Sequence, residues 1–276
     1  MKLVTFLRDG QPRLGALVAS ERGELVFDLN RLDAQIPADM LALLGGGAAM
    51  RLRATAALAS AGLSDGIPLV EVTLAAPIPR PGKIICIGQN YLEHAQESAA
   101  AASPFPIVFA KYSNSVIAHG EPIVIPRCVE KPDYEGELGV VIGKHGRYIP
   151  EADALAWVAG YLPVNDVSAR DWQKRTSQWM MGKAIDTFFP MGPALVTADE
   201  VPDPQALTLR TVVSGEVLQQ GYTGNMIFTV AHLLADLSQV MTLEPGDVIA
   251  TGTPSGVGFA RNPPRWLRPG DVVRVE

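Results

Sequence analysis

Short runs of apolar residues, many of them alternating with polar ones, recur along most of the chain and predict a β-rich protein. Clusters of Gly, Pro, Asn and Asp separate these runs, a pattern typical of β-strands joined by turns. In the first quarter of the chain the predicted strands are residues 2–7, 13–20 and 24–28. In the remainder they are residues 83–87, 107–111, 123–125, 134–142, 158–166, 194–197, 208–213, 247–251 and 271–275.

Three segments instead show features of helices. Residues 38–44 and 48–61 are rich in Ala and Leu and are separated by three glycines, which predicts two short helices. Between residues 227 and 241 apolar side chains recur every three or four positions, which predicts an amphipathic helix. His232 falls on the polar face of that helix, so we expect it to lie in solvent rather than to bind a ligand.

A proline-rich segment divides the chain. Residues 77–82 contain three prolines within five positions, so they cannot continue a helix or a central strand. We therefore predict a small α+β domain at residues 1–76, a linker at residues 77–82 and a larger domain at residues 83–276. The predicted fold class is α+β and rich in strands. The last predicted strand stops at Glu276 without a turn or a polar tail, so we expect the natural chain to continue.

Composition and charge exclude several classes of partner. The chain carries 23 Lys and Arg against 29 Asp and Glu, a formal net charge of −6, and has no run of basic residues. A nucleic-acid partner is therefore not expected, since proteins that bind one present a basic face. The longest apolar-rich stretch, residues 226–241, is too short to cross a membrane. Cys86 and Cys128 offer neither a disulfide framework nor a zinc motif, which favours free thiols in a reducing cytoplasm.

Carboxylates gather around one predicted strand. Glu135 and Glu137 are two residues apart, so in a strand their side chains point to the same face. Two like charges side by side are unfavourable unless a cation or a proton neutralises them, and a solvated acidic face is the alternative. Asp166 ends another apolar strand, just before a helix that Ser168 would cap, and this third carboxylate shifts the balance toward a metal. Three carboxylates without cysteine suit a hard ion, Mg²⁺ or Mn²⁺.

Three further groups could carry chemistry. His94 and Glu97 are three residues apart, so one helical turn would let the carboxylate orient the imidazole as a base for water, unless the two form an ordinary exposed helix pair. Lys183 could offset the negative charge of an enolate, or it could be a surface lysine. Residues 251–258 form a glycine-rich segment whose amides and hydroxyls could hold a carboxylate or could simply make a turn.

These motifs, in this order, resemble those of the fumarylacetoacetate hydrolase family. The resemblance lies within residues 83–258 and rests on five segments: Gly88-x-Asn90-Tyr91-x-x-His94-x-x-Glu97, Asp133-x-Glu135-x-Glu137-Leu138, Asn165-Asp166-x-Ser168-Ala169-Arg170-Asp171-x-Gln173, Lys183-x-x-Asp186-Thr187 and Gly252-Thr253-Pro254-x-Gly256-Val257-Gly258. The resemblance implies a distorted, mixed β-sheet roll as the catalytic core, a small N-terminal domain and a homodimer.

The resemblance also implies a role for each matching residue. The metal ligands for Mg²⁺ or Mn²⁺ would be Glu135, Glu137 and Asp166. The catalytic residues would be His94 and Glu97, which activate water, and Lys183, which stabilises an oxyanion or enolate. The substrate-binding residues would be Arg170, Gln173 and Thr253.

We therefore expect a cytoplasmic, divalent-metal-dependent hydrolase that cleaves a C–C bond in a 2,4-diketo acid through a metal-stabilised enolate. The acylpyruvate-like substrate would bind the metal through its carboxylate and 2-oxo oxygens. Because the same enolate could serve other reactions, two alternatives stay open. The first is a decarboxylase or isomerase of oxaloacetate-like or 2-hydroxy-dienedioate compounds. The second is a metal-binding family member without catalysis.

Overall fold

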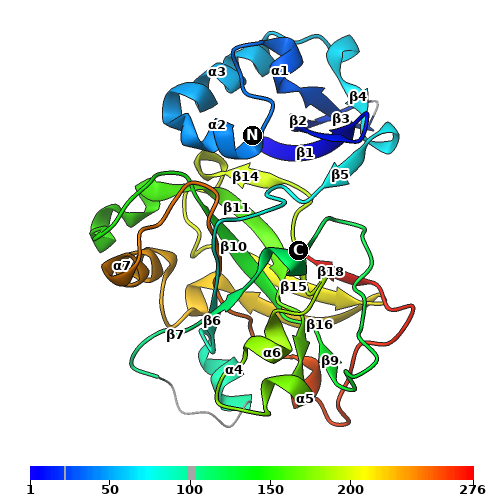
Figure 1. The fold of residues 1–276 in the computed structure, drawn as a ribbon, viewed down its shortest axis with the longest axis vertical. Helices are drawn as coiled ribbons and strands as arrows, with labels where there is room; N and C mark the ends of the chain where they lie inside the picture. Colours follow the sequence, from blue (N-terminus) through cyan, green and yellow to red (C-terminus); the bar gives the residue numbers. More distant parts are fainter. Residues whose placement is uncertain (22, 98–102) are drawn as a thin grey trace.

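One mixed β-sheet runs through the molecule in the computed structural model, which describes residues 1–21, 23–97 and 103–276 (Figure 1). In these residues the sheet has eleven strands, in the order β4-β3-β2-β1-β14-β11-β10-β17-β6-β7, with β5 paired to β1. Neighbouring strands are antiparallel except β17 and β6, which are parallel, so the sheet is mixed as predicted. Its strands are β1 (Lys2–Arg8), β2 (Gln11–Ser20), β3 (Gly23–Asp28), β4 (Ile67–Pro68), β5 (Thr73–Ala75), β6 (Ile84–Gly88), β7 (Ile107–Lys111), β10 (Gly136–Ile142), β11 (Val158–Asn165), β14 (Leu195–Thr197) and β17 (Val248–Ala250).

Smaller sheets and short helices complete the fold. The smaller sheets pair β8 (Val116–Ile117) with β13 (Phe189–Pro190), β9 (Pro132–Asp133) with β12 (Ser168–Ala169), and β15 (Thr208–Val213) with both β16 (Glu216–Tyr222) and β18 (Val273–Val275). The α-helices are α1 (Leu29–Leu32), α2 (Met40–Gly45), α3 (Gly47–Ala59), α4 (Leu92–Glu97), α5 (Arg170–Gln173), α6 (Met180–Lys183) and α7 (Val230–Val240). Single 3₁₀ turns are η1 (Leu63–Asp65), η2 (Leu69–Glu71), η3 (Ser113–Ser115), η5 (Ala198–Glu200), η6 (Thr223–Asn225) and η7 (Gly258–Ala260), and η4 (Glu151–Trp157) is longer.

Strand β10 is the centre of the larger unit. All seven of its residues are buried, because β11 and β17 flank it and both of its faces are covered. Val141 packs on one face, in the core cluster that reaches the N-terminal strands. Val140 and Ile142 pack on the other face, in the cluster that contains the buried side of α7. This continuous burial explains why the second half of the motif around residue 137 is apolar at every position.

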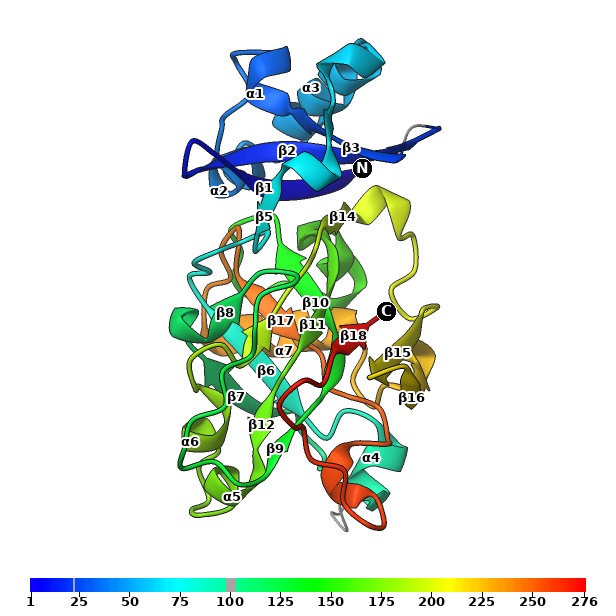
Figure 2. The ribbon, with the colours of Figure 1, turned by 90° about the vertical axis from the view of Figure 1, so that its right-hand side faces the viewer.

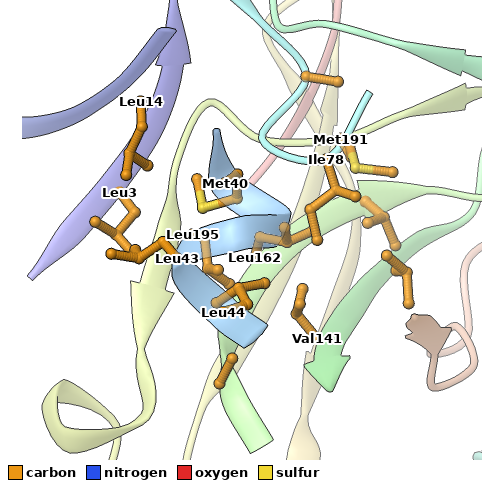
Figure 3. Packing of buried hydrophobic residues seen from close by; sticks show 14 of the residues in the cluster. Leu3, Leu14, Met40, Leu43, Leu44, Ile78, Val141, Leu162, Met191 and Leu195 are labelled. Carbon is orange, nitrogen blue, oxygen red and sulfur yellow. The ribbon is translucent and has the colours of Figure 1, made fainter. Parts of the chain in front are cut away.

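The N-terminal unit is joined to the larger unit by backbone pairing and by a shared core. Strand β1 pairs with β14, with Lys2 opposite Val196 and Leu3 opposite Leu195. Figure 3 shows Leu3, Leu195 and Leu43 of helix α2 packed in one cluster with residues of the larger unit. The division into domains at residues 77–82 stays a prediction, and the sheet and the core both cross it.

Several sequence-based assignments differ from the structure. Residues 123–125 are not a strand: prolines flank them on both sides, and the backbone N–H of Val124 donates to the hydroxyl of Thr187 at 2.8 Å. Strand β16 was not predicted, since its sequence is rich in polar residues and four of its seven residues are exposed. Helix α1 was not predicted either; it is a single turn that Asp28 caps.

The predicted amphipathic helix is α7. Its N-terminus is capped by the Thr229 hydroxyl, which accepts a hydrogen bond from the N–H of His232, and it buries Leu233, Leu234 and Leu237. The His232 side chain is 40% exposed and lies 3.1 Å from Glu151, so it lies at the surface as predicted. Among the described helices, none is both long enough and apolar enough to cross a membrane.

A glycine-to-alanine change in β11 tests how tightly this strand packs against β14, the strand with which β1 of the N-terminal unit pairs. A Cβ at Gly160 would lie 2.1 Å from the carbonyl oxygen of Val196 in β14. We expect Gly160→Ala to destabilise the protein by about 1–3 kcal/mol, because the strands cannot separate without breaking the sheet. Gly45→Ala is the control, since nothing lies within 4 Å of a Cβ at that helical position. Urea unfolding of both variants measures the difference; equal stabilities would contradict this account.

Candidate active site

The functional residues predicted from the sequence lie around one cavity, at the end of the larger unit that is remote from the N-terminal unit. Figures 1 and 2 show α4, α5 and α6 at this end and β1, β2 and α3 at the other. The cavity has a volume of about 130 Å³. Its lining consists of Ile87, Gly88, Gln89, His94, Phe109, Glu135, Glu137, Arg170, Gln173, Lys174, Trp179, Lys183, Thr253 and Phe259.

The three predicted metal ligands meet beside this cavity, with Glu135 and Glu137 in its lining and Asp166 next to them. Oxygen atoms of Glu135, Glu137 and Asp166 all lie within 4.8 Å of one another, and the three side chains are buried. Glu137 lies in β10, whereas Glu135 precedes that strand and Asp166 follows β11. Glu135 is held beside β11 because its N–H donates to the Asn165 side chain at 3.0 Å and its carbonyl accepts from the N–H of Asp166 at 2.9 Å. The predicted gathering of these carboxylates is therefore correct, although Glu135 is not part of the strand.

A closed set of hydrogen bonds fixes the residue between the two glutamates. The N–H of Gly136 donates to Gln219 at 3.0 Å, and its carbonyl accepts from the Thr253 hydroxyl at 2.9 Å. The Gln219 amide in turn donates to Thr253 at 2.8 Å. A Cβ at Gly136 would lie 2.0 Å from the hydroxyl oxygen of Thr211, so only glycine fits here. Thr253 lines the cavity, and its hydroxyl donates to the carbonyl of Gly136, the residue between the two glutamates; its role in substrate binding stays a prediction.

Buried charges form an alternating chain behind the cavity. Each ion pair in it spans 2.6–2.8 Å, and the side chains are at most 6% exposed. In order, the chain is Asp133, Arg170, Glu135, Lys183, Asp166 and Lys111. Glu137 stands outside it: its carboxylate accepts from the N–H of Gly252 at 2.8 Å and has no cationic partner among the ion pairs of the described residues.

The pKa shifts of the two glutamates follow from this difference. Burial, together with the charges of Asp166 and Glu135, raises the pKa of Glu137 well above its ordinary value. Burial acts on Glu135 in the same direction, but the Arg170 guanidinium and the Lys183 ammonium outweigh it and hold the pKa of Glu135 below its ordinary value. The site is therefore short of positive charge at Glu137.

These three residues fit a divalent cation. Their donors are carboxylate oxygens, which hard ions such as Mg²⁺ and Mn²⁺ prefer. A cation bound by all three would give Glu137 the partner that the protein's own side chains do not provide. Lys111 and Lys183 offset the remaining negative charge of the ligand set.

The predicted His94–Glu97 pair is formed and is not an exposed helix pair. Both residues lie in α4, with Nδ1 of His94 2.7 Å from Oε1 of Glu97, and the His94 side chain is only 7% exposed. The Glu97 carboxylate also accepts from the N–H of Gly256 at 3.0 Å, which ties α4 to the glycine-rich loop. Because Nδ1 faces Glu97, Nε2 is the ring nitrogen left to act on a ligand in the cavity.

The other predicted residues also reach the cavity. Lys183 is buried rather than a surface lysine, and its ammonium lies between Glu135 and Asp166 at 2.6 Å from each. The charges of Asp166 and Glu135 outweigh its burial and raise the pKa of Lys183, so this side chain stays charged.

The side-chain oxygen of Gln173 accepts a hydrogen bond from the Arg170 guanidinium at 3.0 Å. Ser168 does not cap helix α5, contrary to prediction: it lies in β12, and its hydroxyl donates to the carbonyl of Asp166.

Several residues of the site were missed from the sequence, among them Lys111 and Asp133. Lys111 ends β7 with its side chain fully buried, and it donates to Asp166 at 2.6 Å and to the carbonyl of Val167 at 3.0 Å. Asp133 accepts from Arg170 at 2.8 Å and from the N–H of Gly258 at 2.7 Å. Asp133 belongs to a recognised motif, so its position could have indicated a role. Nothing in the local sequence marks Lys111 as buried.

Comparisons with known proteins agree with this geometry. Residues 83–276 match the family model "Fumarylacetoacetate (FAA) hydrolase C-terminal". The chain is 44% identical over 270 residues to the human protein "Oxaloacetate tautomerase FAHD2A, mitochondrial", covering 96% of this chain and 84% of that protein. The solved structure of a fumarylacetoacetate hydrolase from Exiguobacterium antarcticum superposes with a TM-score of 0.85 at 37% identity, over 100% of this chain and 95% of the other. A 2-hydroxyhepta-2,4-diene-1,7-dioate isomerase from Mycobacterium marinum gives a TM-score of 0.77 at 30% identity, over 100% and 93%.

Two isosteric substitutions separate the roles of the neighbouring glutamates. Glu135→Gln should destabilise the metal-free protein by about 2 kcal/mol or more, since Arg170 and Lys183 each lose a partner. Glu137→Gln should leave the metal-free protein at least as stable as the wild type, because it removes a buried charge without a cationic partner. We expect added Mg²⁺ or Mn²⁺ to stabilise the wild type, and both variants should lack that stabilisation.

Thermal unfolding with EDTA and with added metal measures both effects. The ordering of the two metal-free variants is the decisive result. If Glu137→Gln were as unstable as Glu135→Gln without metal, the charge balance described here would be wrong.

Proposed function

The chain belongs to the fumarylacetoacetate hydrolase family, and from this premise we propose that it is a divalent-metal-dependent tautomerase that interconverts the keto and enol forms of oxaloacetate-like 2-oxo acids. This is the isomerase alternative considered from the sequence rather than the C–C hydrolase. The 44% identity to a protein named oxaloacetate tautomerase supports it. The homodimer and the cytoplasmic location stay predictions.

The observation that carries the proposal is one cavity lined by a base, a charged amine and two carboxylates of the triad. Tautomerisation needs a base for the C3 proton and positive charge near the 2-oxo oxygen. His94 and Lys183 line the same cavity as Glu135 and Glu137. Both requirements are therefore met by groups that face one small volume.

His94 is the residue suited to move the proton. The C3–H bond breaks, the proton passes to Nε2 of His94, and the electron pair moves onto the 2-oxo oxygen. That oxygen takes a proton from water to give the enol, and the imidazolium of His94 returns its proton to the resulting hydroxide. Glu97 stabilises the imidazolium and keeps the ring in the orientation that this transfer needs. Lys183 is excluded as the base because the two carboxylates beside it keep it charged.

A divalent cation held by Glu135, Glu137 and Asp166 would polarise the 2-oxo group and hold the adjacent carboxylate. Arg170 and Gln173 present their side chains beside that position, and Lys183 adds positive charge where the oxygen becomes negative. The protein's part is to fix these groups before the substrate binds.

Hydrolysis is the second candidate, and one observation favours it. A base that removes a C3 proton can also remove a proton from water, and the buried His94–Glu97 pair has the geometry for either. A structural neighbour is named a fumarylacetoacetate hydrolase. Product analysis must therefore distinguish the two reactions.

The deciding experiment follows three reactions of the Mg²⁺-loaded protein. Oxaloacetate in deuterated water reports exchange at C3 and keto–enol interconversion, pyruvate release reports decarboxylation, and an acylpyruvate in ¹⁸O-labelled water reports C–C hydrolysis. We expect fast interconversion and exchange, no pyruvate above the metal-only background, and slow or no acylpyruvate cleavage. Fast ¹⁸O incorporation without enol formation would replace the proposal with the hydrolase; no reaction of any kind would favour a silent metal-binding protein.

A histidine substitution tests the assigned base. His94→Asn should lower kcat for interconversion by about 100-fold or more while leaving the metal-induced increase in Tm unchanged, since His94 is not a metal ligand. His232→Asn is the matched control, because that histidine lies at the surface near Glu151. Unchanged kcat in His94→Asn would assign the proton transfer to another group.

A further inference from the structure

Positive charges line the proposed active site, and all but one are already paired. Lys183 contacts Glu135 and Asp166, Arg170 contacts Asp133 and Glu135, and His94 contacts Glu97. Lys174 also lines the cavity, and in the described part of the chain no carboxylate lies within ion-pair distance of it. Its charge is therefore available to a ligand.

Lys174 is held at the outer part of the cavity by an aromatic ring. It follows helix α5, one turn after Arg170, and both cations lie against the ring of Phe259. The distances to the ring centroid are 4.6 Å from Cζ of Arg170 and 4.7 Å from Nζ of Lys174. The ring itself is fixed, because the N–H groups of Gly258 and Phe259 donate to Asp133 at 2.7 and 3.1 Å. Arg170 is buried and Lys174 is exposed, so positive charge extends from the carboxylate triad toward solvent.

Other lining residues form an apolar wall. The rings of Phe109 and Trp179 meet edge to face with centroids 5.4 Å apart, and Ile87 lines the cavity with them. A Cβ at Gly88 would lie 2.5 Å from the Trp179 ring, so glycine at this position lets the indole lie close to β6. A charged group placed against this wall would lose its hydration without gaining a partner. Lys174 is the lining group with a free charge for it.

We propose that Lys174 binds the distal carboxylate of the substrate and so makes the site selective for 2-oxo dicarboxylates over 2-oxo monocarboxylates. This inference rests on the proposed function and names its substrate class. The 2-oxo acid end lies at the triad, the carbon chain passes Phe259 and the distal carboxylate meets the Lys174 ammonium. Lys174 is then a specificity-determining residue that acts on binding rather than on proton transfer.

Substitution of Lys174 should separate substrate binding from catalysis in the Mg²⁺-loaded protein. Lys174→Met should raise KM for oxaloacetate about tenfold and leave kcat within about twofold. Inhibition by pyruvate, which has the same 2-oxo acid end and no distal carboxylate, should be unchanged. Lys174→Arg should restore most of the affinity because it keeps the charge.

A neighbouring arginine provides the matched control. Arg175→Met removes the same charge one residue away, where the guanidinium stacks on Trp172 at 3.5 Å, and Arg175 is not part of the cavity lining. It should leave KM unchanged. Equal increases of KM in Lys174→Met and Arg175→Met would indicate general electrostatic attraction, and parallel weakening of pyruvate would place Lys174 at the wrong end of the substrate; either result overturns the inference.

A binding measurement keeps this test independent of the reaction. Malate and lactate are unreactive 2-hydroxy acids that differ in the distal carboxylate, and calorimetry with the Mg²⁺-loaded wild type should show tighter binding of malate. Lys174→Met should abolish that preference. If the preference is lost as expected but oxaloacetate is never turned over, the proposed reaction fails and the substrate class stands. If wild type and variant prefer malate equally, the inference about Lys174 fails whatever the reaction.

Discussion

The alternating chain of buried ion pairs, from Asp133 through Arg170 to Lys111, is the interaction on which the active site depends. Charged groups removed from water are stable only when each finds a partner, and a missing partner is costly. Here each carboxylate in the chain contacts at least one cation at 2.6–2.8 Å. Of the three carboxylates of the triad, only Glu137 has no cationic partner among the ion pairs of the described residues. A bound cation would therefore stabilise the site most at Glu137.

The buried ion pairs also explain how two very short helices, α5 and α6, can hold side chains of the site in fixed positions. Helices α5 and α6 have four residues each, too few to be stable as isolated helices. Arg170 fixes α5 to the residues before β10, and Lys183 fixes α6 to the end of β11. Electrostatic contacts therefore order this end of the molecule, whereas apolar packing orders the sheet and the shared core seen in Figure 3.

The parts of the site that could be predicted from the sequence are those set by local spacing. The spacing of His94 and Glu97 gives a contact because one helical turn joins them. Asp166 is at the end of a strand, and antiparallel pairing of β10 with β11 brings it to Glu135. Lys111 and Gln219 could not be found in this way, because their contacts depend on which strands become neighbours across long stretches of chain. The strand predicted at residues 123–125 was wrong for a related reason: the segment has the apolar pattern of a strand, but no other strand lies beside it to pair with it in the described structure.

Arg170 and Lys174 lie one helical turn apart, and both contact the ring of Phe259. They differ in how much a substitution would destabilise the folded protein. Arg170 is buried between two carboxylates, so its replacement would disturb the folded core of the site. Lys174 is exposed and unpaired by carboxylates in the described chain, so its replacement costs the fold little. An enzyme lineage with this arrangement could acquire new substrates by drift at one outward position while the reaction chemistry beneath it stays intact. Helix α5 and the residue directly after it would then hold both the part of the site that is fixed and the part that can vary.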